Sequence, residues 1–382
     1  MISAMTTRER LQAAWRCEDV DHVPLAFHFW GAPRHPRAVY GNERERLAFY
    51  LAHQWDTCVT LASQVTVSPD VRVEVRREMA DGQPVLHQIW HTPGGTLEER
   101  LRITDDWPQV VDPNGGPVYF GDDFRSSRYL EFPVKSMSDL AVLPYLFPPE
   151  QARDSEGMMQ QHRELRALAD VFDVPLQVYH PAGMDWLLWL FPPEEIILRT
   201  VEEPAFVQTL LETINCAYTQ RLEVLLELGV DSVCRRGWYE STDFWNPRHF
   251  REFARPTLTL EMQHCRTAGV PYIYLMDSGV VPLLSELATL DFNCLLGVDP
   301  ATQPVDLAQL RAALPGKALW GGISGPLHLG EGTPAQVEEA VAAAFAACGR
   351  RGFILGMGVG VRANWPWENI EAMERAWHRW RC

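Results

Sequence analysis

The sequence predicts a (β/α)8 barrel, and three observations favour this fold. Eight short apolar runs, each of a length typical of a buried strand, recur along the chain. From residue 170 onward, amphipathic helical stretches separate these runs without hairpins, which indicates parallel βα units. No G-x-G-x-x-G motif follows an early strand, which disfavours the competing open, doubly wound sheet. Eight parallel strands are the number that closes this barrel.

The elements are expected in a regular order. The strands are residues 23–30, 56–63, 171–178, 230–235, 271–276, 292–296, 317–323 and 352–355. The helices are residues 7–15, 43–55, 204–229, 246–269, 333–349 and the segment that begins at residue 366. Asn246 and Thr333 are N-cap residue types, and each is followed by a proline suited to a first helical turn. Gly229, Gly269 and Gly349 are typical of helix ends.

Residues 65–150 interrupt this alternation. Residues 71–78 and 84–91 flank the turn-forming segment 80–83 (ADGQ), a pattern typical of an antiparallel hairpin. The segment follows the second strand, and loops that follow barrel strands lie on the C-terminal face, where active sites of this fold are built. We therefore expect one barrel domain over residues 1–382, with residues 65–150 as an insertion that covers the C-terminal face.

The composition excludes several classes of protein. The chain has 382 residues, a formal charge of −16, 46% hydrophobic and 22% charged residues, which is typical of a folded globular protein. No run approaches the roughly 18 apolar residues of a membrane span, and no secretory signal is recognisable at the start. The acidic balance argues against a nucleic-acid partner. We expect a cytoplasmic protein whose eight dispersed cysteines are reduced, with Cys234 and Cys294 buried in strands.

Six segments spread over nearly the whole chain carry a family resemblance. They are residues 6–15 (TTRERLQAAW), 21–24 (DHVP), 131–140 (EFPVKSMSDL), 320–323 (WGGI), 352–360 (GFILGMGVG) and 366–370 (PWENI). Together they resemble the uroporphyrinogen decarboxylase superfamily. The resemblance implies an (α/β)8 barrel with a central cleft. Branches of that superfamily include the haem-pathway decarboxylase and zinc-dependent methyltransferases that serve corrinoid proteins.

The chain departs from both branches at their signature positions. The decarboxylase branch has an MRQAGRY segment after its first strand, whereas residues 29–37 here read FWGAPRHPR and keep Arg34 and Arg37 as possible anion binders. Its histidine before the last glycine-rich turn corresponds to Val359. The methyltransferases carry H-x-C-G where residues 276–279 here read MDSG, and their distant cysteine ligand also corresponds to Val359. Neither catalytic set is intact.

Two histidines follow predicted strands. On the first strand the period of two places His28 on one face with Ala26 and Trp30. His28 could be a metal ligand, a proton carrier or a hydrogen-bonded structural group. His180 ends the third strand and leads into a Pro/Gly turn, in which Asp185 could cap the helical segment that follows it.

The fourth and fifth strands end in the most polar segments of the chain. Residues 234–240 (CRRGWYE) bring Arg235 and Arg236 together with Glu240, a set that would hold an anionic substrate. The structural alternative is that Arg235 and Glu240 form an ion pair. Asp277 follows an apolar strand directly, and a carboxylate there needs a partner, a metal or a proton. Asp277 is the strongest single candidate for a functional residue.

The expected roles of these residues can be stated together. The expected catalytic residues are Asp277, Glu240 and His180, and the expected ligands of a zinc ion are His28, His180, Glu240 and Asp277. The expected substrate-binding residues are Arg235, Arg236, Tyr239, Trp30, Arg34, Arg362 and Asn364, of which Asn364 could instead cap the last helix.

Three functions remain open. The first is a corrinoid-dependent methyltransferase, or demethylase, that acts on a methylated small molecule, with zinc as a Lewis acid and the corrinoid carried by a partner protein. The second is decarboxylation of a tetrapyrrole or polycarboxylate through Arg34, Arg235 and Arg236, with Asp277 returning a proton. The third is a non-catalytic barrel that binds a tetrapyrrole or corrinoid. The sequence leaves monomer and homodimer open.

Overall fold

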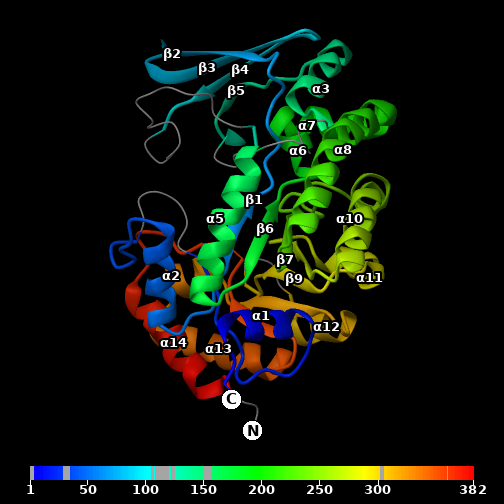
Figure 1. The fold of residues 1–382 in the computed structure, drawn as a ribbon. Coiled ribbons are helices and arrows are strands. Elements are labelled where there is room, and N and C mark those ends of the chain that lie inside the picture. The colour runs from blue at the N-terminus through cyan, green and yellow to red at the C-terminus, as the bar shows by residue number, and fades with distance from the viewer. Residues whose placement is uncertain are drawn as a thin grey trace.

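The computed structural model describes residues 4–28, 35–104, 107, 120–121, 125–149, 156–301, 305–358 and 360–382. Within them the chain forms a seven-stranded parallel sheet and a four-stranded antiparallel sheet (Figure 1). The parallel sheet has the order β1-β6-β7-β8-β9-β10-β11, so each strand lies beside the next one of the barrel. Its strands are β1 (Val59–Ala62), β6 (Leu176–His180), β7 (Ser232–Arg236), β8 (Tyr272–Leu275), β9 (Cys294–Val298), β10 (Ala318–Gly322) and β11 (Phe353–Gly356).

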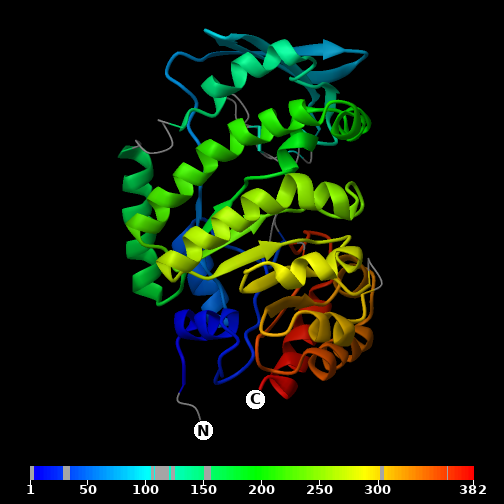
Figure 2. The ribbon, with the colours of Figure 1, turned by 90° about the vertical axis from the view of Figure 1, so that its right-hand side faces the viewer.

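Helices connect these strands and cover the outer face of the sheet (Figures 1 and 2). The α-helices are α1 (Thr7–Trp15), α2 (Glu43–Ala52), α3 (Leu143–Leu146), α5 (Glu156–Phe172), α6 (Asp185–Leu190), α7 (Pro193–Glu202), α8 (Pro204–Leu228), α9 (Pro247–His249), α10 (Arg255–Ala268), α11 (Leu284–Thr289), α12 (Leu307–Ala313), α13 (Pro334–Cys348) and α14 (Trp367–Trp380). The 3-10 and π turns are η3 (Met137–Val142), η4 (Phe250–Ala254), η5 (Val281–Leu283) and η6 (Gly325–Gly330). The expected caps are present, since the side chain of Thr333 accepts from the Gln336 amide and Gly269 is left-handed at the end of α10.

Residues 23–28 take the eighth position of the barrel through an isolated bridge instead of a full strand. The Ala26 amide donates to the Leu355 carbonyl and the Leu355 amide donates to the Pro24 carbonyl, both at 2.9 Å. On the other side, the Asp56 amide donates to the Leu25 carbonyl at 2.8 Å, just before β1. The ladder is short because Pro24 has no amide hydrogen. The segment therefore meets both ends of the seven-stranded sheet, and the predicted (β/α)8 fold is confirmed.

The third strand begins later than the sequence suggests. Val171 and Phe172, placed in that strand by their apolar side chains, form the last turn of α5. Asp173 takes a φ of 52° and ends the helix, so that β6 starts only at Leu176. One continuous apolar run thus spans the end of a helix and the start of a strand, which periodicity alone cannot separate.

The inserted segment contains the predicted hairpin and extends it to a small sheet. Strands β2 (Arg72–Ala80), β3 (Gln83–Thr92), β4 (Gly95–Arg102) and β5 (Tyr129–Glu131) are antiparallel neighbours in that order. Asp81 and Gly82 both have positive φ, as a type I′ turn requires, which explains the tight connection of β2 to β3. This sheet lies at the opposite end of the molecule from α1 and the C-terminus (Figures 1 and 2).

The pleat of the parallel strands separates two apolar layers. One layer contains Cys234, Ile273, Cys294 and Trp320 together with Trp15 of α1, and it fills the interior of the barrel. The other layer joins the alternate strand residues to the surrounding helices. Because α1 packs against residues at the beginnings of the strands, it closes the N-terminal end of the barrel. The opposite, C-terminal end is the end at which active sites of this fold are built.

The cysteines and the helices agree with two further expectations. All eight cysteines carry free thiols, and Cys234 and Cys294 are buried in β7 and β9 as expected. None of the helices in the described part of the chain is both long enough and apolar enough to cross a bilayer.

A buried ion-pair cluster near α1 predicts a pH-dependent contribution to stability. Arg10 of α1 contacts Asp56 at 2.6 Å and Asp21 at 2.7 Å. Burial raises the pKa of Asp56 to about 6, against the opposing charge of Arg10. The folded state therefore binds this proton more tightly than the unfolded chain does, and the contribution is lost as pH rises through about 6.

We expect Asp56→Asn to remove this pH dependence. Between pH 4 and 7 the free energy of unfolding of the wild type should fall, relative to that of the variant, by roughly 2–3 kcal/mol. Urea unfolding of both proteins across this range measures the difference. A difference that stays constant over the range would contradict the assignment.

Candidate functional site

The strand pleat places the two neighbouring arginines of β7 on opposite faces. Arg236 pairs in register with Leu275, which belongs to the interior layer, whereas Arg235 pairs with Tyr274, which belongs to the outer layer. Successive side chains of a strand alternate between faces. Arg236 therefore points into the barrel and Arg235 toward the surrounding helices.

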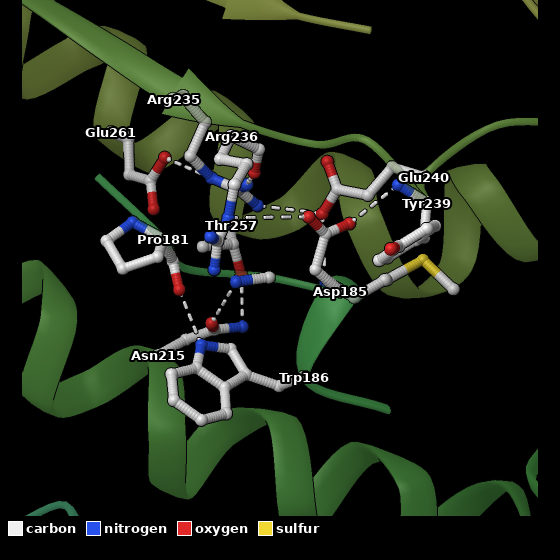
Figure 3. A network of polar contacts seen from close by, with 12 residues as sticks. Pro181, Asp185, Trp186, Asn215, Arg235, Arg236, Tyr239, Glu240, Thr257 and Glu261 are labelled. Atoms are coloured by element: carbon white, nitrogen blue, oxygen red, sulfur yellow. Dashed lines mark hydrogen bonds and ion pairs between the residues drawn. The ribbon is translucent and has the colours of Figure 1, made fainter. Parts of the chain in front are cut away.

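Arg235 lies at the centre of a fully buried polar network (Figure 3). Its guanidinium contacts Glu240 at 2.7 Å and Glu261 of α10 at 3.2 Å. The Tyr272 hydroxyl donates to Glu261 and the Tyr274 hydroxyl donates to Glu240, each at 2.6 Å. Burial alone lowers the pKa of Arg235, but the two carboxylates more than reverse this and hold it well above its usual value. The network is a satisfied structural cluster.

His180 joins the same network from β6. Its Nδ1 lies 2.8 Å from the Ser63 hydroxyl and its Nε2 lies 3.2 Å from Glu261, and all three residues have no exposed surface. Glu240 is likewise buried and also accepts the Met184 amide at 2.8 Å. These contacts correct the expectation that His180 and Glu240 face the barrel interior as catalytic residues. The structural alternative, an ion pair of Arg235 with Glu240, is what the structure contains.

Arg236 lies on the interior side among aromatic rings. Its guanidinium carbon is 4.0 Å from the centre of the Trp189 ring, 5.3 Å from that of Trp238 and 5.5 Å from that of Tyr179. Its Nε lies 3.8 Å from a carboxylate oxygen of Asp185. The arginine is only 4% exposed, so this enclosure weakens its hydration and strengthens its attraction for an anion.

Asp185 supports this arginine and does not cap the following helix. It is the first residue of α6 and accepts the amides of Trp238 and Tyr239, at 3.2 and 2.9 Å, across the network (Figure 3). The expected cap is therefore wrong, because the carboxylate is used to hold the turn after β7. Tyr239 is half-buried and takes part through its backbone, while its ring packs on Phe244.

Asp277 also lies on the interior side, two residues beyond the interior Leu275. A Cβ built on Gly297 or Gly358 would approach the Asp277 Oδ1 atom to 2.5 and 2.6 Å respectively, so the Asp277 carboxylate packs directly against the backbone of both glycines. Burial, followed by the charge of Asp277, raises the pKa of the interior Cys234 thiol to about 12, whereas the nearby arginines oppose that rise.

The predicted zinc ligands do not form one donor set. Among the described residues, which include all four predicted ligands, no three His, Cys, Asp or Glu side chains lie where they could hold a metal ion. Glu240 and His180 are committed to the outer network, while Asp277 faces the interior. Burial lowers the pKa of His28 to about 3, which leaves the imidazole in the neutral form that binds metals, but His28 belongs to no group of three donors among the described residues. The residues present therefore do not fit the expected zinc site.

The remaining candidates lie apart from this interior group or outside the described residues. Arg362 and Asn364 are exposed, and Asn364 does not cap α14, whose N-cap is Pro366 without a side-chain hydrogen bond. Arg37 binds Glu371 at 3.2 Å. Trp30, Arg34 and Val359 lie outside the described residues.

Sequence reasoning missed several members of the outer network: Ser63, Glu261, Tyr272 and Tyr274. One signal was available. Glu261 falls on the apolar face of α10, between the buried residues Leu258, Met262 and Cys265. A carboxylate at such a position requires a buried cation or donor, and Arg235 of the preceding strand is that cation.

Comparison with known proteins shows which fold and family this chain shares. A methyltransferase from Methanosarcina mazei aligns over 98% of this chain and 99% of its own chain, with 17% identity and a TM-score of 0.60, which shows a common fold. A B12-independent methionine synthase from Shewanella sp. W3-18-1, solved in complex with selenomethionine, aligns over 59% of this chain and 66% of its own, with 12% identity and a TM-score of 0.43. No curated protein sequence matches. The family model for uroporphyrinogen decarboxylase (URO-D) matches residues 146–380, more than half of the sequence, and the chain therefore belongs to this family.

Proposed function

We propose that this protein is a methyltransferase that removes a methyl group from an anionic small molecule and delivers it to a corrinoid carried by a partner protein. One observation carries the proposal. The C-terminal end of the barrel, where active sites of this fold are built, presents Asp277 and the aromatic-enclosed Arg236 on the same interior side. An acid and a single enclosed cation suit a methylated monoanion.

The two side chains have distinct roles in this reaction. Arg236 binds the negatively charged group of the substrate and thereby orients the methylated atom. In this reaction Asp277 acts as a carboxylic acid: it donates a proton to the oxygen or nitrogen from which the methyl group departs, so that the bond between carbon and that atom breaks without forming an anion. The corrinoid, when bound, supplies the nucleophile that accepts the methyl group. Asp277 then regains a proton from water.

The geometry favours this reaction over decarboxylation of a polycarboxylate. That alternative assigns substrate carboxylates to Arg34, Arg235 and Arg236. Arg235 is neutralised by Glu240 and Glu261 on the outer face, where no substrate carboxylate can reach it. Loss of one of three expected cations removes much of the attraction for several negative charges. In this proposal Asp277 activates the leaving group by protonating it, which is the role expected for zinc as a Lewis acid.

We expect Asp277→Asn to lower kcat for methyl transfer by about 10²- to 10⁴-fold, the usual contribution of a general acid, with little change in thermal stability. Methoxyacetate and 4-methoxybenzoate serve as probes because each combines a methyl group with one carboxylate. Transfer to reduced cobalamin is followed by absorbance. Asp291→Asn, at an exposed surface ion pair with Arg266, is the control and should retain full activity.

Other outcomes would identify the alternatives. Full activity of Asp277→Asn would contradict the role of this carboxylate. Release of carbon dioxide from uroporphyrinogen would favour the decarboxylase, and tight binding of a corrinoid without turnover of any probe would favour a non-catalytic barrel.

A further inference from the structure

We infer that the buried Glu99–Arg125 ion pair of the inserted segment is a positioning device for Arg236, and that it acts through Phe120 and Gly121. The role of Arg236 in substrate binding rests on the proposed function. The path of contacts from Glu99 and Arg125 through Phe120 and Gly121 to Arg236 does not depend on that function, and it can be tested without a substrate.

The path begins in the middle of the small sheet. Glu99 of β4 is fully buried and accepts the Gln88 side-chain amide at 2.7 Å and the Trp90 indole at 3.3 Å. It also forms a close ion pair with Arg125, which is fully buried as well. Burial would lower the pKa of Arg125, but the charge of Glu99 more than compensates and keeps the guanidinium ionised. The pair is therefore a strongly coupled anchor.

This anchor holds Phe120 in place. The Arg125 guanidinium carbon lies 4.9 Å from the centre of the Phe120 ring, and the Phe120 and Trp90 ring centres are 4.5 Å apart. Phe120 is 2% exposed. The ring thus contacts both an arginine bound to Glu99 and an indole bound to Glu99, so one carboxylate determines the position of both of its neighbours.

The next residue reaches the barrel. The Gly121 carbonyl accepts a hydrogen bond from Arg236 Nη2 at 3.1 Å, across 115 residues of sequence. This bond restricts the rotation of the guanidinium, while Trp189 and Asp185 restrict it from the barrel side. The inserted segment consequently helps decide the direction in which Arg236 presents its positive charge. It also brings the insertion to the C-terminal end of β7, although coverage of the whole face stays a prediction.

Two adjacent glutamates provide a matched test. Glu99 faces the buried cluster, whereas Glu98 faces the other side of β4, is 45% exposed and binds His87 at 2.5 Å. Glu99→Gln removes the charge that holds Arg125, and Glu98→Gln makes the same chemical change without touching the path. We expect Glu99→Gln to accelerate backbone hydrogen exchange about tenfold, both at Phe120–Gly121 and in the turn after Arg236.

Glu98→Gln should leave exchange in both places within twofold of the wild type. Phe120→Leu, which removes the ring but keeps the ion pair, should reproduce the effect on the turn after Arg236 and serves if Glu99→Gln fails to fold. Faster exchange that stays confined to β3 and β4 in both variants would overturn the inference.

A kinetic readout separates positioning from simple loss of structure. With whichever methoxylated probe gives turnover, Glu99→Gln should raise KM about tenfold and change kcat less than twofold, because only the orientation of the binding cation changes. In an Arg236→Met background the same substitution should no longer affect KM. An additive effect in that background would overturn the inference, whereas absence of turnover in the wild type would count against the proposed function alone.

Discussion

Arg235→Met is expected to lower the free energy of unfolding by about 3–5 kcal/mol, because it removes the cation from between two buried carboxylates. Glu240 and Glu261 would each keep a hydroxyl partner, and Glu261 would keep His180, but both buried carboxylates would lose the arginine that neutralises them. Urea unfolding followed by circular dichroism measures the loss.

The pH dependence of this variant has a defined sign. Burial raises the pKa of Glu261, but Arg235 and His180 reverse this and hold it below the usual value. In the wild type its contribution to stability is therefore lost only as pH falls through that depressed pKa. Without Arg235 the carboxyl pKa should rise, so the variant should approach the wild type in stability as the solution is acidified. A stability deficit that grows at acid pH would contradict this assignment.

The neighbouring Arg236→Met is the matched control. Its ion pair with Asp185 is looser, at 3.8 Å, and Asp185 keeps two amide donors after the substitution. We expect a loss of about 1–2 kcal/mol in stability together with a large increase in KM for the methoxylated probes. Equal destabilisation by the two substitutions would contradict the assignment of the two arginines to opposite faces.

Gly183→Ala should destabilise the protein by about 4 kcal/mol or more, since a new methyl group would collide with the ion pair of Arg235 and Glu240. A Cβ on Gly183 would lie 1.7 Å from Arg235 Nη2 and 2.2 Å from Glu240 Oε1. The turn cannot simply move away, because the Gly183 amide donates to Asn215 at 2.8 Å.

Gly229→Ala provides a control at the same φ. Gly183 and Gly229 both have a φ of 87°, but a Cβ on Gly229 meets nothing within 4 Å. Its alanine variant should lose about 1–3 kcal/mol, the usual cost of holding a side chain in a sparsely populated backbone region. Thermal denaturation of the two variants isolates the steric contribution, and similar losses would show that backbone strain alone accounts for Gly183.

Local signals in the sequence account for most of the fold. The hairpin turn at Asp81 and Gly82 and the helix cap at Thr333 depend on contacts within a few residues, which a sequence displays directly. The end of α5 differs from the prediction for the opposite reason: the apolar pair Val171 and Phe172 suits either a helix or a strand, and only Asp173 marks the break.

The candidate site was predictable only in part. Asp277 and Arg236 follow from their places at strand ends. The separation of Arg235 from Arg236 also follows from the pleat, but the sequence does not say which of them faces inward. Strands of a parallel barrel are apolar on both faces, so their hydrophobic pattern does not show which face points into the barrel. Arg235 is the arginine that faces outward because it pairs with Glu261 of α10, which lies 26 residues further along the chain.

By itself, the sequence determined the order of the eight barrel segments, the position of the insertion and the family to which the chain belongs, since these depend on local periodicity and short motifs. Only the tertiary structure decided that His180 and Glu240 support a buried network while Asp277 and Arg236 face the interior. The physical reason is that a buried charge is stable only beside its partner, and here the partners are brought together by packing of helix on strand and not by proximity in the chain.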